Sequence, residues 1–291
     1  MTRHMFAGAA TPVGFVDFFD YIMPLERAKR RYFLKGASGS GKSTFMKVLA
    51  AKLADAGCLT EIFHCANDAQ SLDAVGVWDR GLCFLDATLP HSRDPQIPGA
   101  IDIIIDFARF IDGEKVSRSL DEIKSLLGQK KMLYDKAMGH FAAVFGAKEP
   151  PMDFLEKERK LFLSAITPDG PVSFAEDFFG NCAVQTTSQE QIKKIRSEAA
   201  SAGLLMESFY SPLRPSRIEY LFLPSEGEVY ADEEEIWANH DGIDEIVAQM
   251  NFARTCHLKI EKIYVAAMDF RAVDKMTEGI AAEWGKLENI D

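Results

Sequence analysis

The sequence G-A-S-G-S-G-K-S-T, residues 36–44, follows the apolar run Tyr32-Phe33-Leu34 and matches the pattern G-x-x-x-x-G-K-[ST]. Its glycines lack a Cβ, so the backbone can take positive φ angles and turn its N–H groups inward around an anion. A helix predicted over about residues 42–56 would point its positive dipole end at the same place. The stretch therefore predicts a phosphate-binding loop. Its residues are Gly36, Ala37, Ser38, Gly39, Ser40, Gly41, Lys42, Ser43 and Thr44.

Two side chains of this loop suit the chemistry of a bound nucleotide. The Lys42 ammonium would reach the β- and γ-phosphates, and the Ser43 hydroxyl would hold Mg²⁺. Further along, Leu82-Cys83-Phe84-Leu85-Asp86 is an apolar strand that ends in a carboxylate. We predict that Asp86 binds the Mg²⁺ shell close to Ser43 and that Lys42 and Asp86 act in catalysis.

The residue that follows Asp86 is Ala87, where ATPases of the additional-strand class usually have a catalytic glutamate. Another residue must therefore orient the attacking water, or hydrolysis is slow. Polar candidates occur in two segments that we place at the carboxyl ends of strands, although a residue in such a position is more often an ordinary loop residue than a catalyst. They are Asp68, Asp73, Thr88, His91, Arg93 and Asp94. Among them we favour Asp68 and His91.

These motifs resemble those of the P-loop NTPase superfamily. The segments L-K-G-A-S-G-S-G-K-S-T-F-M-K, H-C-A-N-D-A-Q-S-L-D-A-V and L-D-A-T-L-P-H-S-R-D-P-Q-I-P-G-A-I-D look like a bacterial family of duplicated P-loop ATPases. The resemblance extends to the end of the chain and implies ATP binding. In that family both units generally carry a P-loop, whereas this chain has lost the second one.

An internal repeat divides the chain. Residues 6–18 align with residues 162–174 at a shift of 156, and residues 54–86 align with residues 200–232 at a shift of 146. The residues missing from the second copy fall where the first copy has its glycine loop. We therefore expect a tandem duplication, with a nucleotide-binding unit at 1–150 and a degenerate unit without the loop at 151–291.

The apolar pattern predicts the fold class. Strands that alternate with helices indicate an α/β fold, with a parallel sheet covered by helices on both faces. Residues 98–112 and 119–145 are predicted as helices and would form an α-helical appendage to the first unit. Two more helices, at about 244–263 and 272–287, would end the second unit.

The degenerate unit contains S-P-L-R-P-S-R, which places Arg214 and Arg217 where the first unit has Asp68 and Ser71. Tandem P-loop proteins often complete one site with an arginine from the neighbouring unit, where it stabilises charge in the transition state. We hypothesise that Arg214 or Arg217 acts in this way. The alternative is a surface arginine in a proline-rich loop.

Composition narrows the class of protein. The chain is 47% hydrophobic and 26% charged, as in ordinary soluble proteins, and its net charge of −11 comes from the second half. An acidic second half disfavours binding to nucleic acid, and we interpret the one basic cluster, residues 27–31, as a solvated strand entry. Five scattered cysteines without metal spacing indicate reduced thiols, and neither a signal peptide nor a membrane span is evident. We expect a cytoplasmic location and no membrane partner.

These observations favour a Mg²⁺-dependent ATPase or ATP-driven switch that hydrolyses the β–γ phosphoanhydride. One alternative is a kinase that transfers the γ-phosphoryl group to a small metabolite or nucleotide. The missing glutamate after Asp86 favours it, because a kinase must suppress attack by water. Another is a non-hydrolysing ATP sensor that engages a protein. The expected partners are ATP, Mg²⁺ and either a protein or a small-molecule acceptor, with a homo-oligomer as one expected assembly.

Overall fold

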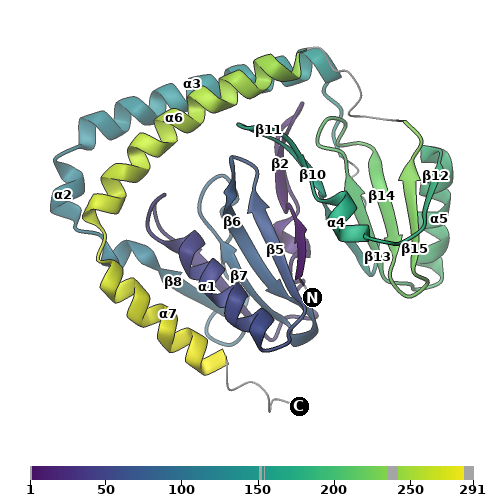
Figure 1. Ribbon diagram of the computed structural model, residues 1–291, viewed down its shortest axis with the longest axis horizontal. Helices are drawn as coiled ribbons and strands as arrows, with labels where there is room; N and C mark the ends of the chain where they lie inside the picture. Colours follow the sequence, from purple (N-terminus) through teal and green to yellow (C-terminus); the bar gives the residue numbers. More distant parts are fainter. Residues whose placement is uncertain (1, 151–152, 154, 235–241, 285–291) are drawn as a thin grey trace.

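The computed structural model describes residues 2–150, 153, 155–234 and 242–284. It has an α/β fold with mixed sheets and flanking helices. Figure 1 shows two sheets side by side and a pair of long helices, α3 (Leu120–Phe145) and α6 (Ile243–Ala267), that arches over the first sheet. α7 (Phe270–Trp284) follows α6 and runs beside α1 (Lys42–Asp55).

The first sheet has six strands, with all but β6 running in the same direction. Helix α1 covers one face through Phe45, Met46 and Leu49, all of them buried. In spatial order the strands are β1 (Thr2–Met5), β5 (Thr60–Cys65), β6 (Asp68–Val77), β7 (Leu82–Asp86), β4 (Arg30–Lys35) and β8 (Asp102–Asp106).

The prediction of a parallel sheet is wrong at β6. Only Ala66 and Asn67 separate the end of β5 from the start of β6. A link of two residues can join antiparallel strands, whereas parallel neighbours need a crossover of a dozen residues or more. The run from Leu72 to Val77 is buried without alternation because both faces of the sheet are covered at this strand.

The helix predicted over residues 98–112 is also wrong. This segment forms the edge strand β8 and the short 3₁₀ helix η3 (Phe107–Phe110). Three consecutive isoleucines at 103–105 favour a strand, since β-branched side chains lose less freedom there than in a helix. Asp102 anchors the strand start, because its carboxylate accepts from Arg31 Nε at 2.7 Å and from the Gln96 amide at 2.6 Å.

Among the described residues, the second sheet has five strands, which repeat the order of β1, β5, β6, β7 and β4 and the single reversed strand of the first sheet. Helix α5 (Gln189–Ser201) covers it and begins at Ser188, whose hydroxyl accepts from the Gln191 amide. In spatial order the strands are β12 (Val184–Thr187), β15 (Glu228–Asp232), β14 (Ile218–Leu223), β13 (Met206–Tyr210) and β9 (Glu158–Leu161).

The two sheets meet through a matched contact. Phe6 and Phe162 exchange both backbone hydrogen bonds, at 2.9 and 3.0 Å, and their side chains are fully buried. A small antiparallel hairpin follows each of them. The remaining elements are β2 (Gly8–Thr11), β3 (Gly14–Asp17), η1 (Phe19–Tyr21), η2 (Trp78–Arg80), α2 (Gly113–Ser117), β10 (Ser164–Thr167), β11 (Gly170–Ser173) and α4 (Ala175–Phe179).

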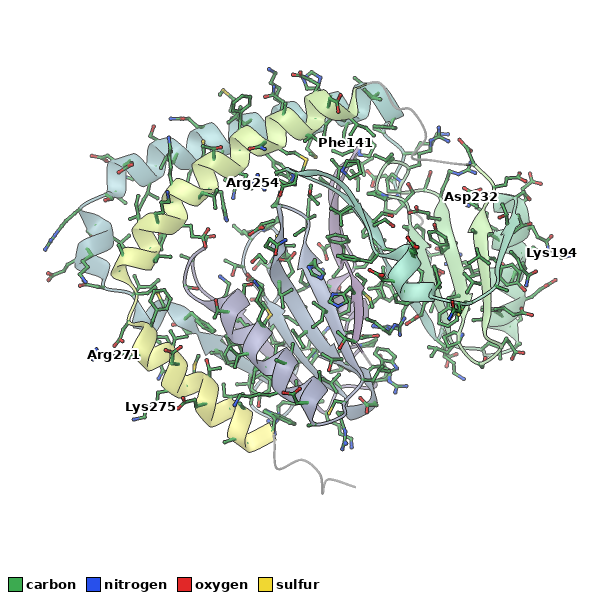
Figure 2. All side chains as sticks on the ribbon, viewed as in Figure 1. Phe141, Lys194, Asp232, Arg254, Arg271 and Lys275 are labelled. Carbon is green, nitrogen blue, oxygen red and sulfur yellow. The ribbon has the colours of Figure 1, made fainter. Side chains whose placement is uncertain are left out.

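The helix predicted over residues 119–145 is confirmed as α3, and it pairs with α6 along its length. Phe141, labelled in Figure 2, is buried in a cluster that joins these two helices to both small hairpins.

The later helices also exist, but they pack on the first unit. Val273 and Ala281 of α7 lie in the core around Phe45, and Trp284 Nε1 donates to the Tyr32 hydroxyl at 2.9 Å. Within the described residues, no helix is long and apolar enough to cross a membrane.

Candidate functional site

The loop between β4 and α1 has the backbone that the glycine pattern predicts. Gly39 and Gly41 have φ angles of +76° and +90°, and a Cβ at Gly36 would stand 2.8 Å from the Phe107 Cβ. Gly41 is the N-cap residue of α1 and offers no side chain to the first-turn amides. Those amides therefore point into the loop, where an anion can accept from them.

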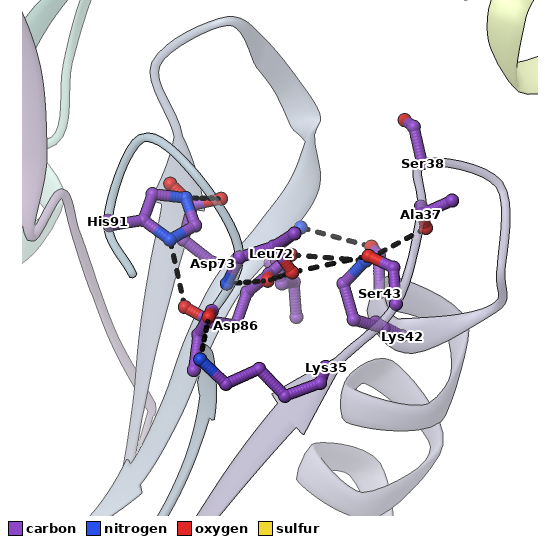
Figure 3. A network of polar contacts seen from close by, with 12 residues as sticks. Lys35, Ala37, Ser38, Lys42, Ser43, Leu72, Asp73, Asp86 and His91 are labelled. Carbon is purple, nitrogen blue, oxygen red and sulfur yellow. Dashed lines mark hydrogen bonds and ion pairs between the residues drawn. The ribbon is translucent and has the colours of Figure 1, made fainter. Parts of the chain in front are cut away.

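Lys42 is turned back into the loop (Figure 3). Its Nζ donates to the carbonyl oxygens of Gly36 and Ala37, at 2.7 and 2.9 Å, and lies 3.5 Å from Oδ2 of Asp86. Only 7% of the Lys42 side chain is exposed. A buried ammonium held by carbonyl oxygens and one carboxylate is placed to receive a phosphate with a small movement of its chain.

The metal-binding residues predicted from the sequence face the same loop. Oδ1 of Asp86 accepts from the Thr88 amide at 3.0 Å and lies 2.5 Å from the Thr88 hydroxyl. The Ser43 hydroxyl accepts from the Leu72 amide at 3.0 Å. Strands β6 and β7 therefore hold these two groups at the carboxyl end of β4, as expected for ligands of an open α/β sheet.

A cavity of about 290 Å³ opens over the loop. Ala37 does not line it and contributes only its carbonyl oxygen to Lys42. Arg93 and Asp94 lie outside the lining too, and Arg93 pairs with Asp17 and Asp20. The other residues predicted for the site are brought together around this cavity. They are Gly36, Ser38, Gly39, Ser40, Gly41, Lys42, Ser43, Thr44, Asp68, Asp73, Asp86, Thr88 and His91.

His91 is held by protein groups at both ring nitrogens. Its Nδ1 donates to the Asp86 carbonyl oxygen at 2.8 Å, and its Nε2 lies 3.6 Å from Asp73. The ring is buried and stacks on Phe19 at 4.6 Å between centroids. Burial lowers the pKa of His91, but the carboxylates of Asp73 and Asp86 outweigh it and hold that pKa above its ordinary value. These contacts suit a histidine that supports the backbone at Asp86.

Asp68 is the more open of the two favoured candidates. It lies at the start of β6, and its Oδ1 accepts from the Gln70 amide at 3.1 Å. The other carboxylate oxygen has no hydrogen bond among the contacts of the described residues. Asp68 thus stays the better candidate to orient a water molecule, although its role remains a prediction.

The hypothesis that Arg214 or Arg217 completes this site is wrong. Neither lines the cavity. Arg217 binds the Asp232 carboxylate through Nε and Nη2, at 2.8 and 2.9 Å, and Arg214 pairs with Glu234. Asp232 ends β15 as Asp86 ends β7. The Arg217 guanidinium neutralises Asp232, whereas Lys42 approaches Asp86 in the first unit.

Sequence analysis missed a set of side chains that the paired helices α3 and α6 bring over the loop. The Lys130 ammonium donates to Nδ1 of His257 at 3.1 Å, and Nε2 of His257 lies 2.7 Å from the Ser38 hydroxyl. Burial, and then Lys130 and Lys42, lower the pKa of His257 to about 4. The neutral ring accepts from Lys130 at Nδ1, so its Nε2–H donates to Ser38.

Two more residues of α6 complete this set. Arg254 lines the cavity, and a Cβ on Gly39 would stand 2.8 Å from the backbone oxygen of Glu261. Burial and Asp68 raise the pKa of Glu261 above its ordinary value, against the opposing effect of Lys42. Arg254, His257 and Glu261 are three and four residues apart on one face of the helix. The sequence contains this stripe but does not indicate what it faces.

Comparisons with protein-family models, curated proteins and solved structures find no match for this chain. The geometry around the loop is therefore the basis for a functional assignment. It combines backbone amides, a lysine, a hydroxyl and a carboxylate around one cavity, with a set of helix residues beside them.

Proposed function

We propose that this protein binds ATP with Mg²⁺ at the loop of residues 36–44 and hydrolyses the β–γ phosphoanhydride, as an ATPase or an ATP-driven switch. The observation that carries the proposal is the position of Lys42, buried against loop carbonyls and 3.5 Å from Asp86. The uncapped start of α1 and the positive φ angles at Gly39 and Gly41 supply the amides for phosphate.

The donor set fits Mg²⁺ bound together with phosphate. Ser43 would supply a hydroxyl oxygen, and Asp86 a carboxylate oxygen, to the ion. Within the part of the chain that the structure describes, no three or more His, Cys, Asp or Glu side chains are grouped to hold a metal by themselves. Mg²⁺ usually takes one or two carboxylates, with substrate phosphates and water in its other positions. Bound there, the ion would neutralise charge on the β- and γ-phosphates.

We further propose that the two units are repeats of one P-loop unit and that the second has lost its loop. The shared strand order and the shared reversed strand support this interpretation. The pairing of Arg217 with Asp232 supports it too. The arginine balances the charge of this carboxylate, so Asp232 needs no metal ion beside it. The cysteines that are free in the structure agree with a cytoplasmic location, which we also propose.

A kinase is the second candidate, and the residue after Asp86 favours it. Ala87 is fully buried and its amide donates to the Leu34 carbonyl oxygen at 3.0 Å, so it offers no group to activate water. The cavity extends past the loop to Asp68 and Tyr134, which leaves a polar region for an acceptor. A sensor that binds ATP without turnover would share these features.

Phosphate release from ATP and Mg²⁺, without an acceptor, tests the assignment. We expect wild-type turnover, and a loss of about a hundredfold or more in Lys42→Ala because the lysine contacts the transferred phosphate. Lys52→Ala is the matched control, since Lys52 is an exposed residue on the same helix. ATP binding without phosphate release would favour the kinase or the sensor. Absence of ATP binding would refute the proposal.

A further inference from the structure

Helix α6 places three polar side chains at the opening of the cavity. His257 contacts Ser38, and Glu261 packs against Gly39. Arg254 lies one turn before His257 and lines the same cavity as Lys42. Since residues three and four apart share a helix face, Arg254 faces the space beyond the loop. A guanidinium is therefore present on the open side of the phosphate site.

Arg254 is held there by a carboxylate of the second unit. Its Nη1 and Nη2 donate to the two carboxylate oxygens of Asp169, at 2.5 and 2.8 Å. Asp169 lies in the turn between β10 and β11, where the Thr167 hydroxyl donates to the Gly170 carbonyl oxygen. Asn251 of α6 donates to the Pro168 carbonyl oxygen of the same turn at 3.2 Å. Figure 2 shows Arg254 near the middle of α6. The turn of the second unit thus has two polar ties to the helix over the first.

This ion pair is suited to exchange. The Asp169 side chain is 61% exposed and Arg254 is 21% exposed, so water screens the attraction between them. A guanidinium that binds a carboxylate with two donors binds phosphate with the same geometry, and phosphate carries more charge. The corresponding turn of the first unit has Val13 in place of Asp169, so the acid is specific to the second turn.

Building on the proposed function, we propose that Arg254 distinguishes a nucleoside triphosphate from a diphosphate. With a γ-phosphate in the cavity, its guanidinium leaves Asp169 and binds the terminal phosphate. The turn at residues 167–170 then loses one of its two ties to α6. The second unit, which has no phosphate loop of its own, senses in this way whether the first unit holds a triphosphate.

Equilibrium titration with ADP and with the β,γ-imido analogue of ATP, both with Mg²⁺, tests the discrimination. We expect Arg254→Ala to lose about tenfold in affinity for the analogue and less than about twofold for ADP, because only the terminal phosphate contacts the guanidinium. Asp169→Asn should bind the analogue about threefold more tightly, since a competing carboxylate is removed. Arg271→Ala, an exposed arginine on α7, is the matched control and should change neither affinity.

Hydrogen–deuterium exchange over residues 164–173 gives a second readout. The analogue should speed exchange of this segment in the wild type and leave it unchanged in Arg254→Ala. Equal losses for both nucleotides, or none, would overturn the role of Arg254 while leaving ATP binding intact. If the wild type binds neither nucleotide, the proposed function itself fails, and this inference fails with it.

Discussion

Arg159 binds Glu61 with both ends of its guanidinium, through Nη1 at 2.9 Å and Nη2 at 2.8 Å, and so joins the second unit to the first. The same Nη1 donates to Glu207 of its own sheet at 2.7 Å. Arg3 pairs with the same two glutamates from the first unit. Each arginine therefore pairs with both glutamates, and positive and negative side chains alternate at the interface.

Replacement of Arg159 should destabilise the protein strongly. Arg159→Met leaves Glu61 and Glu207 buried with only Arg3 to balance them, which we expect to cost about 3–5 kcal/mol of unfolding free energy. Urea denaturation followed by circular dichroism measures this loss. Arg118→Met, an exposed arginine, should stay within about 0.5 kcal/mol of the wild type. A loss at Arg159 no larger than at Arg118 would mean that the cluster does not hold the units together.

His257 should make stability depend on acidity. Burial, Lys130 and Lys42 lower its pKa in the folded protein to about 4, from the ordinary 6.5. Between these values the unfolded chain binds the proton and the folded chain does not. Its contribution to unfolding free energy is therefore complete above pH 6.5 and falls as the pH drops toward 4, by up to about 3 kcal/mol.

Urea denaturation at pH 7 and pH 4.5 measures this effect. His257→Gln should lose less stability than the wild type over that interval, since glutamine does not titrate. His140→Gln, at a half-exposed position of α3, should keep the wild-type dependence. Parallel curves for the wild type and His257→Gln would show that His257 titrates normally.

The last helix should be essential to the first unit. Ala281 is buried in the core that includes Tyr32 and Phe45, whereas Ala282 is exposed on the same helix. Ala281→Asp buries an unpaired carboxylate and should cost about 3 kcal/mol or more, while Ala282→Asp should change stability by less than about 0.5 kcal/mol. Thermal unfolding compares them. Similar melting temperatures for the pair would contradict the packing of α7 on α1.

Gly39 should tolerate no side chain. Its φ of +76° is unfavourable for other residues, and a Cβ would stand 2.8 Å from the Glu261 backbone oxygen. We expect Gly39→Ala to cost about 1–3 kcal/mol and to weaken ATP binding, because the loop must shift away from α6. Gly128→Ala, in open space on α3, should instead stabilise by about 0.5–1 kcal/mol. Calorimetry of both variants, with and without ATP, tests the contrast. Unchanged stability and ATP binding in Gly39→Ala would refute it.

Local signals in the sequence predicted the parts of the site that lie close together along the chain. The loop of residues 36–44, the strand Leu82–Asp86 and the helix that begins at Lys42 were found because their patterns arise from backbone geometry and burial of each element alone. The same approach missed that β6, which begins at Asp68, runs antiparallel to its neighbours. A two-residue hairpin turn and a short loop have the same composition.

The sequence alone predicted a phosphate loop at residues 36–44 and a second half without one. Which parts of the second half reach that loop depends on how distant segments pack together. The internal repeat pointed to Arg214 or Arg217, which pair with Glu234 and Asp232, whereas Arg254 lines the cavity. The physical reason is that α6 buries its apolar face against α3 of the first unit. That long-range packing turns its polar face to the loop, and no local pattern encodes it.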